Sequence, residues 1–438
     1  MRPWECRLAA LRTLHRIASA IGSSLAFVCV AGAAEDLNAS RADFQDDPTC
    51  AVDQTQKLRD AVARAAGGSL TLPSGTICLK SERSTITVAA PNTEIAGRGR
   101  STVIKWDAPQ GSPIAPIIDI LPTADHVTLR DIGFDHNAGS GNYRPSDYFG
   151  ANPWGGIAVS IQADDFSGDK LWVRNGFDNC IGVSRMDPAN QLAKPGLPQR
   201  FTLSNIHTEN CGSGRHPVER GGPGRIGAGI DNGSGSAGVI ENVVDFRSYG
   251  SFIADIGAGA YASWSNITSF YSRVDERKDT PALYVGAPYN SFTTVSIIAP
   301  QGRGIWSDRY AAGSLFANVT IKSAGGPCLF IKGGAQWTNV NCVDPSFAAP
   351  GTQPAILVDS SAGPIAALSI RGFAVATPAS RPSSAIQMVG DHHVEGAISA
   401  LDFAGPVAPP GASLERAGLR IEGLKAPGQT TGQPESLR

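Results

Sequence analysis

A short pattern of polar and apolar positions recurs between residues 203 and 342, where a turn ending in Asn is followed at once by Ile or Val. The segments between these turns are short, rich in β-branched residues and interrupted by Gly, without the 3.6-residue apolar period of a long helix. A period of about 20–50 residues is typical of repeat architectures, whose units bury their apolar faces by stacking on one another. We therefore predict an all-β solenoid, a single-stranded parallel β-helix. The recurring asparagines are Asn205, Asn242, Asn266, Asn318 and Asn339.

The spacing of these asparagines supports stacked coils. The longest gap, from Asn266 to Asn318, fits two turns if a degenerate copy lies at Thr293. Asn tolerates left-handed backbone, and its side chain bonds to nearby groups in turns. On coils about 4.8 Å apart, the stacked amides would also bond to one another and form an interior ladder.

The clearest helix is predicted over residues 53–66, because its apolar residues fall on one stripe and a Gly-Gly pair follows it. The stripe consists of Leu58, Ala61, Val62 and Ala65. A solenoid needs its open end covered, so this helix is expected to cap the first coil. We place the β-helix domain at residues 45–405 and a Pro/Gly-rich C-terminal tail at 406–438.

A second recurring segment follows each Asn turn, and alternation along a strand predicts which of its residues face solvent. The residues predicted to face the core are Ile181, Ile230, Ile253, Leu283, Ile305, Leu329 and Ile356. The residues predicted to face outward are Gly182, Asp231, Ala254, Tyr284, Trp306, Phe330 and Leu357. Ser184, Asp308, Lys332 and Asp359 stand one step further along the outer surface. In this register Asp255 points inward, and a slip of one residue exposes it.

This outward column predicts a polysaccharide groove. Asp231, with Asp255 or Asp308, is the candidate acid/base set, and Tyr284 and Trp306 are candidates for stacking on sugar rings. Carboxylates one coil apart would be about 5 Å apart and two coils apart about 10 Å, which brackets the separations of retaining and inverting glycosidases. The alternative is that each Asp is a turn residue and each aromatic side chain packs under a loop.

Cationic residues beside the groove would bind the carboxylates of uronic acids. Arg185 and Lys332 are the candidates for this role.

A second candidate cluster is Asp135-His136-Asn137, followed by a long insertion that contains Arg144. Long loops on a rigid scaffold often carry function, and His136 is a candidate catalytic acid or base. Asp135 and Arg144 are candidates for substrate binding. A capping or turn role for the triplet is the alternative.

Composition excludes some partners. The 37 Lys and Arg residues nearly balance the 39 acidic residues, giving a net charge of -2, and no basic patch suggests nucleic acid or a membrane surface. Charged residues are only 17% of the chain, below the usual quarter, which suits a turn-rich β solenoid.

Residues 1–34 are predicted to be an export signal, with a basic start, an apolar run over 21–30 and an A-x-A cleavage site at 31–33. The apolar run is too short for a membrane span. The mature protein is therefore expected to be secreted or periplasmic.

Removal of the signal would take away Cys6 and Cys29 of the eight cysteines and leave an even number in an oxidising compartment. Pairing of nearest neighbours is the simplest scheme, with buried free thiols as the alternative. The predicted bridges are Cys50–Cys78, Cys180–Cys211 and Cys328–Cys342.

The N-terminal motifs D-x-T-x-x-L-x-x-A-V (53–62), GGSLTLPSG (67–75) and IAGRGRSTVI (95–104) resemble the opening of the pectin-lyase-like superfamily, in the branch often labelled pectate lyase 3. This resemblance covers essentially the whole mature chain and implies a right-handed parallel β-helix with an N-terminal capping helix. It is a poor guide to the reaction, because the fold hosts lyases, glycoside hydrolases, epimerases, tailspikes and adhesins. The sequence lacks the catalytic signatures of polygalacturonases, pectate lyases and alginate epimerases, so no catalytic residue is carried over.

The expected function is an exported enzyme that cleaves an acidic polysaccharide by β-elimination or glycosidic hydrolysis. The alternative is a non-catalytic carbohydrate-binding or envelope-structural β-helix, which flat ladders of Thr, Ser and Asn would favour; an epimerase is a third reading. No cofactor is expected; exposed aspartates would permit Ca²⁺, but no convincing set is present. The oligomeric state stays open.

Overall fold

The structure is a computed structural model, and its described residues all belong to one compact unit within residues 35–438. It describes residues 36–38, 43–81, 84–112, 114–138, 156–184, 200–212, 227–233, 237–254, 261–273, 280–409 and 418–422. The predicted export signal lies outside these residues.

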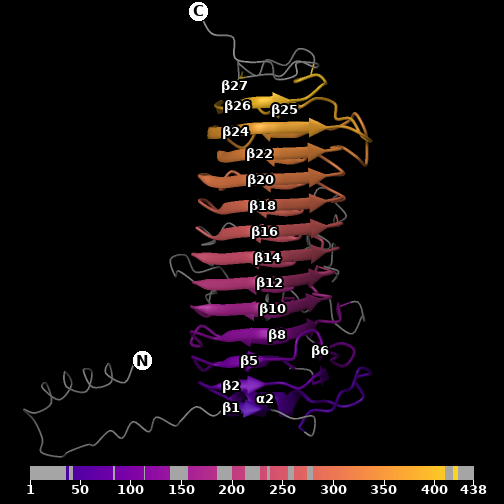
Figure 1. Ribbon diagram of the computed structural model, residues 1–438, viewed down its shortest axis with the longest axis vertical. Coiled ribbons are helices and arrows are strands. Elements are labelled where there is room, and N and C mark those ends of the chain that lie inside the picture. The colour runs from indigo at the N-terminus through magenta and orange to yellow at the C-terminus, as the bar shows by residue number, and fades with distance from the viewer. Residues whose placement is uncertain are drawn as a thin grey trace, which may run out of the picture. The chain divides into compact units, whose positions relative to one another are not determined.

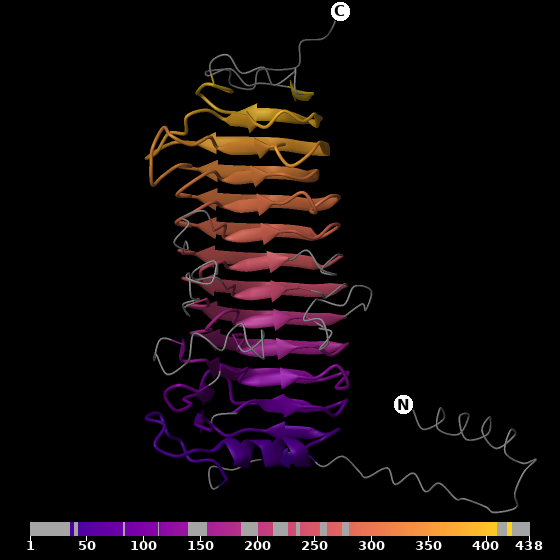
Figure 2. The ribbon, with the colours of Figure 1, turned by 180° about the vertical axis from the view of Figure 1, so that it is seen from behind.

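The described chain winds through two long parallel sheets, as the stacked rungs in Figures 1 and 2 show. Sheet A contains 16 strands, most of them long. Its strands are β1 (Asp36–Asn38), β2 (Ser69–Thr71), β3 (Gly75–Leu79), β5 (Glu94–Ala96), β6 (Thr102–Trp106), β8 (Thr128–Asp135), β10 (Phe166–Arg174), β12 (Phe201–Glu209), β14 (Gly238–Phe246), β16 (Ser263–Phe270), β18 (Ser291–Ile298), β20 (Ser314–Lys322), β22 (Ala335–Val343), β24 (Ile365–Ala376), β26 (Val394–Asp402) and β27 (Leu419–Glu422).

Sheet B contains 11 short strands, and along most of the solenoid each coil contributes one strand to each sheet. Its strands are β4 (Ile86–Val88), β7 (Ile118–Ile120), β9 (Val159–Ile161), β11 (Ile181–Val183), β13 (Ile230–Asn232), β15 (Phe252–Ala254), β17 (Leu283–Val285), β19 (Ile305–Ser307), β21 (Leu329–Ile331), β23 (Ile356–Asp359) and β25 (Ile386–Val389). The parallel β-helix predicted from the repeats is therefore confirmed.

The recurring asparagines bend the long strands of sheet A. Asn205, Asn266 and Asn339 have φ of 56°, 52° and 54°, in the left-handed region that Asn tolerates. Thr294 has a φ of 57° and occupies the same place on β18, one residue after the predicted degenerate copy. One left-handed residue turns each long strand without ending it.

The amide ladder forms, but on the surface. Asn266 Nδ2 donates to Asn242 Oδ1 at 2.7 Å, and Asn339 Nδ2 donates to Asn318 Oδ1 at 3.2 Å. These side chains are exposed, so the expectation of an interior ladder was wrong. The left-handed corner directs the side chain outward while its neighbours on the strand fill the core.

The core beneath this corner contains a stack of aromatic rings. Trp264, Phe292, Phe316 and Trp337 occupy one register position on β16, β18, β20 and β22, and each is at most 1% exposed. Adjacent ring centroids are 5.7, 4.8 and 3.7 Å apart, with nearly parallel planes in the last two pairs. Identical register on successive coils thus gives each large ring a matching neighbour, and this stacking supports a continuous core.

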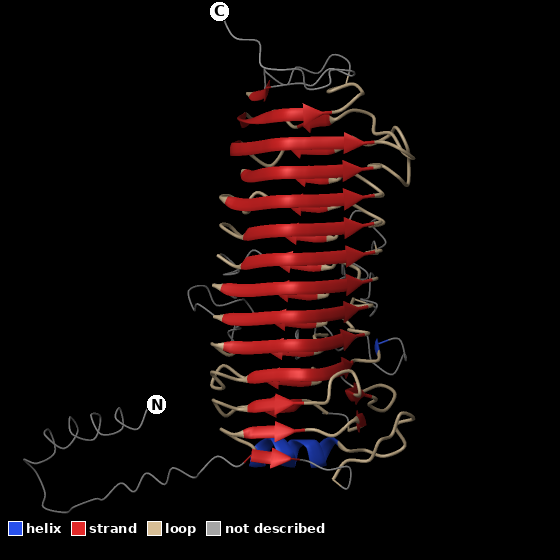
Figure 3. Ribbon diagram, in the orientation of Figure 1, coloured by secondary structure: helices blue, strands red, loops and turns tan. Residues whose placement is uncertain are grey.

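The predicted capping helix is α2 (Thr55–Arg64). Leu58, Ala61, Val62 and Ala65 are all buried, as the apolar stripe indicated. Figure 3 shows α2 lying across the first rungs of the stack. At the other end, β27 (Leu419–Glu422) pairs with β26, so coil pairing extends past residue 405.

All three predicted disulfides are formed: Cys50–Cys78, Cys180–Cys211 and Cys328–Cys342. The first joins the chain before α2 to β3. In the other two, the cysteine directly before a sheet B strand is joined to one just after β12 (Cys180–Cys211) or within β22 (Cys328–Cys342).

Candidate functional site

The outward face of sheet B carries one continuous column of side chains, set by the parallel register. In strand order from β7 to β23 the column is Asp119, Ser160, Gly182, Asp231, Ile253, Tyr284, Trp306, Phe330 and Leu357. The sequence placed Ala254 in this column, and that was wrong by one residue. Phe252 and Ala254 are buried on either side of Ile253, because the larger Phe252 side chain fills the core.

Three aromatic rings form the centre of this column on successive strands. The Tyr284 and Trp306 centroids are 5.5 Å apart with planes at 81°, and those of Trp306 and Phe330 are 5.0 Å apart at 63°. Tyr284 and Trp306 are half-buried and Phe330 is 4% exposed. Edge-to-face packing of this kind holds the rings in fixed positions.

A row of charged residues runs beside these rings, directly after β19 and β21 and at the last residue of β23. Tyr284 Oη donates to Asp308 Oδ2 at 2.6 Å, and the Arg309 backbone N–H donates to Asp308 Oδ1 at 2.7 Å. Lys332 Nζ lies 3.2 Å from Asp359 Oδ2. The row therefore alternates in sign along the solenoid as Asp308, Lys332 and Asp359.

The electrostatics of this row keep Asp359 ionised. Burial opposes the charged form, but hydrogen bonds from Ser361 and the Lys332 ammonium outweigh it and hold the pKa of Asp359 below its usual value. The carboxylate is therefore negative at neutral pH and available as a hydrogen-bond acceptor.

Two cations also lie over the aromatic rings. Arg303 Cζ is 3.9 Å from the Phe330 ring centroid and 5.0 Å from that of Trp306. Lys332 Nζ is 5.4 Å from the Trp306 centroid. Cation–π contacts keep these positive groups at the surface of the column, where an anionic ligand would meet them.

Asp231 lies two strands before Tyr284 in the same column. Asn179 Nδ2 donates to its Oδ2 at 2.7 Å. Nearer the N-terminus, on β7, burial raises the pKa of Asp119, although hydrogen bonds from Gln162 and Ser160 oppose the rise. The N-terminal part of the column is thus acidic.

Strand spacing decides which carboxylates can act together. Asp231 lies on β13 and Asp308 directly follows β19, three strands away, so at about 4.8 Å per strand their backbones are at least about 14 Å apart. That exceeds the roughly 6.5–9.5 Å of inverting glycosidases, so the predicted pairing of Asp231 with Asp308 is not supported. Asp308 and Asp359 are two strands apart, about 10 Å at the backbone, which is close to the upper end of that range.

Three predicted site residues, Asp255, Arg185 and Arg144, lie outside the described residues.

His136 is buried, contrary to the prediction of a catalytic acid or base. Its Nε2 lies 2.9 Å from the Ala115 carbonyl, and its Nδ1 accepts the Phe177 backbone N–H at 3.3 Å. The side chain is in edge contact with Trp106, and burial lowers the pKa of His136 to about 4. A neutral, enclosed imidazole with both nitrogens engaged is a structural group.

Asp135 is also structural where substrate binding was predicted. It is 5% exposed and accepts hydrogen bonds from Arg174 Nε and Asn175 Nδ2, both at 2.9 Å, and from the Asn137 backbone at 3.0 Å. These contacts match the turn role given as the alternative. Asn210 Nδ2 donates to Asn175 Oδ1 at 2.9 Å, which continues a second polar ladder that the sequence did not reveal.

Arg303 is the residue of the sheet B surface that sequence reasoning missed. It precedes β19 in a turn, where strand alternation gives no direction for a side chain. Its only sequence signal is its position three residues before Trp306.

Among the residues that the structure describes, no group of three or more His, Cys, Asp and Glu side chains is arranged to hold a metal ion. In the same part of the chain, no helix is long and apolar enough to cross a membrane.

Comparison with known proteins finds similarity in structure and not in sequence. No family model matches the sequence. No curated protein matches it either. Solved structures do match: the Agl-KA catalytic domain has a TM-score of 0.58 at 14% identity, over 90% of this chain and 68% of that one.

Two viral proteins match as well. The enzymatically active domain of bacteriophage CBA120 tailspike protein 2 has a TM-score of 0.51 at 12% identity, over 92% of this chain and 53% of that one. ORF18 of Geobacillus virus E2 has a TM-score of 0.51 at 12% identity, over 82% of this chain and 61% of that one. This chain thus spans about half to three fifths of those two proteins.

At such identities the likeness is one of fold. Together with the two parallel sheets and the capping helix, it establishes that this chain has a right-handed parallel β-helix fold.

Proposed function

We propose that this protein is an exported polysaccharide-active enzyme that holds an acidic glycan along the outer face of sheet B. The observation that carries the proposal is the coincidence, on adjacent coils, of three ordered aromatic rings with a row of alternating charges. Aromatic surface beside carboxylates suits a sugar chain, whose rings offer C–H faces and whose hydroxyls need polar partners. The Agl-KA catalytic domain and the enzymatically active tailspike domain have the same fold, which is consistent with an enzyme.

The residues divide into three roles. Trp306 and Tyr284 contact the sugar rings, and Arg303 and Lys332 attract the uronate carboxylates through charge-assisted hydrogen bonds. Asp308 and Asp359 are the catalytic carboxylates. Asp231, nearer the N-terminus, contacts the glycan about three sugars away from the reaction.

The carboxylate spacing supports hydrolysis over elimination. A separation of about 10 Å at the backbone leaves room for a water molecule between a general acid and a general base, as in inverting enzymes. Asp359, held ionised by Lys332 and Ser361, suits the base. Asp308, two coils before Asp359, is then the acid and must carry a proton when the substrate binds.

Export is part of the proposal. Three disulfides within one solenoid are typical of proteins from an oxidising compartment, in agreement with the predicted signal at residues 1–34.

The test is an assay of the purified mature protein against pectins, alginates and bacterial exopolysaccharides, with and without EDTA. New reducing ends without the ultraviolet absorbance of unsaturated uronates are expected, and Asp308→Asn should lower kcat by about a hundredfold or more. Asp402→Asn, an exposed carboxylate on sheet A, is the matched control and should leave the rate unchanged. Unsaturated products would replace hydrolysis by elimination, and no cleavage of any acidic glycan would contradict an enzyme.

A non-catalytic glycan-binding function is the second candidate, and one observation favours it. Thr268, Ser296, Thr320 and Asn341 occupy a single outward column on β16, β18, β20 and β22. This is a flat ladder of hydroxyl and amide groups without converging charges. Glycan retention without cleavage in the same assay would support that function.

A further inference from the structure

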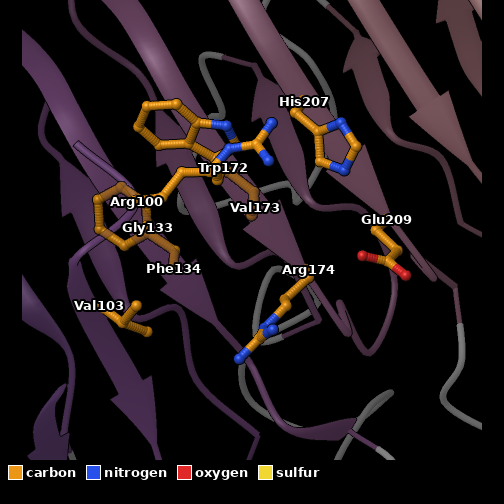
Figure 4. Close-up of a pocket in the computed structure, with 9 residues that line it drawn as sticks. All are labelled: Arg100, Val103, Gly133, Phe134, Trp172, Val173, Arg174, His207 and Glu209. Carbon is orange, nitrogen blue, oxygen red and sulfur yellow. The ribbon is translucent and has the colours of Figure 1, made fainter.

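A hollow of about 270 Å³ opens on the outer face of sheet A, on a different surface from the sheet B column. Figure 4 shows polar and aromatic side chains from β8, β10, β12 and the turn before β6 around an open centre. The residues that define it are Arg100, Gly133, Trp172, Arg174, His207 and Glu209. Its volume is near the lower end of the roughly 300–1,000 Å³ of ligand pockets, which suits one sugar-sized ring.

Gly133 is what leaves the space open. It stands between Val103 and Trp172 in the register of β6, β8 and β10. A Cβ atom there would lie 3.3 Å from Val103 Cγ2 and 3.2 Å from the Thr102 carbonyl oxygen. A side chain at this position would therefore occupy the hollow beside the indole of Trp172.

The side chains around the hollow are held in place by contacts of their own. Arg100 Cζ lies 5.2 Å from the Trp172 ring centroid, and stacking on an indole presents the guanidinium N–H groups at its edge. Arg174 is anchored through Nε, which donates to the buried Asp135 at 2.9 Å. Trp172 and Arg174 thus form a fixed framework of apolar surface and hydrogen-bond donors.

The charges around the hollow balance. Arg100, Arg174 and Glu209 line the hollow, and the second negative charge is that of the buried Asp135, which lies behind the lining and accepts a hydrogen bond from Arg174 Nε at 2.9 Å. Burial, and next the neighbouring Arg100, lower the pKa of His207 against the opposing effect of Glu209, so the imidazole is neutral at pH 7. The site therefore offers hydrogen-bond donors and an acceptor but carries no net charge. Hydroxyl groups match such a site, since each can donate and accept.

The hollow also lies at the head of the hydroxyl ladder. Trp172 and His207 occupy the same column as Val244, Thr268, Ser296 and Thr320 in the register of β10 to β20. A chain of sugars that begins in the hollow would first cross Val244 and then continue over hydroxyl groups on coils about 4.8 Å apart.

We propose that this hollow binds one ring of a neutral glycan that then runs along the outer face of sheet A. It is a binding site without chemistry of its own, separate from the sheet B column, and does not rest on the activity proposed there. Trp172 supplies apolar surface, the two arginines donate to ring hydroxyls, and Glu209 accepts from them.

Titration calorimetry of the full chain with neutral oligosaccharides of glucose, xylose, mannose and galactose, and with oligogalacturonate and oligoalginate, tests the proposal. At least one neutral oligosaccharide should bind, with an affinity that added salt does not weaken. Trp172→Ala and Glu209→Gln should each weaken binding about tenfold or more. Gly133→Val, which fills the hollow, should abolish it.

Two controls distinguish this site from the rest of the surface. Lys322→Gln removes a charge from the sheet A column that contains Arg174 and Glu209, and it should leave the affinity unchanged. Asp308→Asn, on sheet B, should also leave it unchanged. The proposal is overturned if no neutral oligosaccharide binds, if the three hollow variants bind as the wild type does, or if only uronates bind and salt weakens them.

Discussion

Asp245 on β14 lies inside the solenoid among hydroxyl-bearing side chains. Thr208 Oγ1 and Ser248 Oγ donate to its Oδ1 at 2.7 and 2.6 Å. Burial raises the pKa of Asp245 to about 6, even though hydrogen bonds from these residues and from Ser251 lower it in part. Gly229 makes the group possible, since a Cβ there would lie 2.5 Å from Asp245 Oδ1.

The raised pKa of Asp245 makes stability depend on pH in a defined direction. The folded state binds this proton more tightly than the unfolded state, so the stabilisation is complete below pH about 4 and is lost as the pH rises through about 6. We expect wild-type stability to fall by about 3 kcal/mol over this range relative to Asp245→Asn, measured by denaturant unfolding. Asp391→Asn, an exposed control, should follow the wild type; equal pH profiles for wild type and Asp245→Asn would contradict the assignment.

His136 produces the opposite dependence. Because its folded pKa of about 4 lies below the unfolded value of about 6.5, its contribution is complete above pH 6.5 and is lost as the pH falls toward 4. His136→Gln should remove about 3 kcal/mol of this pH-dependent term and lower the melting temperature at neutral pH. Activity per folded molecule should stay at the wild-type level, and its loss by a hundredfold or more would restore a catalytic role.

The corner formed by the asparagines belongs to the scale of the element. A residue in left-handed backbone costs about 1 kcal/mol or more unless it is Gly or Asn. Hydrogen bonds between asparagines on adjacent coils, such as that from Asn266 to Asn242, stabilise the corner further.

Asn266 is the residue that tests the corner, because it links β16 to β14 through Asn242. Asn266→Ala should lose both the backbone preference and the hydrogen bond, about 1–2 kcal/mol in total. Asn266→Gly keeps the backbone freedom and should lose less. Thermal unfolding of both variants measures the difference; equal losses for Ala and Gly would show that the left-handed backbone is not what Asn266 provides.

At the same scale, the sequence predicted the features that depend on only a few neighbouring residues. Asn before Ile or Val marks a left-handed corner, and the stripe from Leu58 to Ala65 marks a helix, because turn and helix preferences act within a few residues. The register of β15 could not be fixed in this way. Three-residue strands between turns carry little alternation, so the choice between Phe252 and Ile253 as the inward residue depends on how the neighbouring coils fill the core.

The same limit applies to the candidate site. The sequence predicted that one surface would hold Asp308, Lys332, Tyr284 and Trp306, because their strands repeat in register. Arg303 and the hollow around Trp172 depend on turn geometry and on the absence of a side chain at Gly133, which no periodicity encodes. Asp135 and His136 are polar residues at the end of β8, and only the closure of the coil buries them.

At the scale of the whole molecule, two of the disulfides, Cys180–Cys211 and Cys328–Cys342, link the sheet A side of the solenoid to the sheet B side. Cys328–Cys342 closes a loop of 14 residues and should contribute about 3 kcal/mol by restricting the unfolded chain. Replacing both cysteines by Ser should lower the denaturation midpoint accordingly. The glycan specificity should not change, because neither sulfur reaches the outer surface. An unchanged midpoint would contradict a stabilising role for this bridge.

The two sheets also divide the proposed functions of the molecule. Sheet B combines fixed rings with alternating charges, and sheet A offers a neutral hollow and a hydroxyl ladder. A solenoid makes this division possible, because every coil contributes the same positions to each face.

The central claim, that an acidic glycan lies along sheet B, is tested most directly by a crystal structure of the Asp308→Asn variant with an acidic oligosaccharide. Sugar rings are expected over Trp306 and Tyr284, with a uronate carboxylate within hydrogen-bond distance of Arg303 or Lys332. An acidic oligosaccharide bound elsewhere on the solenoid, with the Trp306 surface empty, would contradict it.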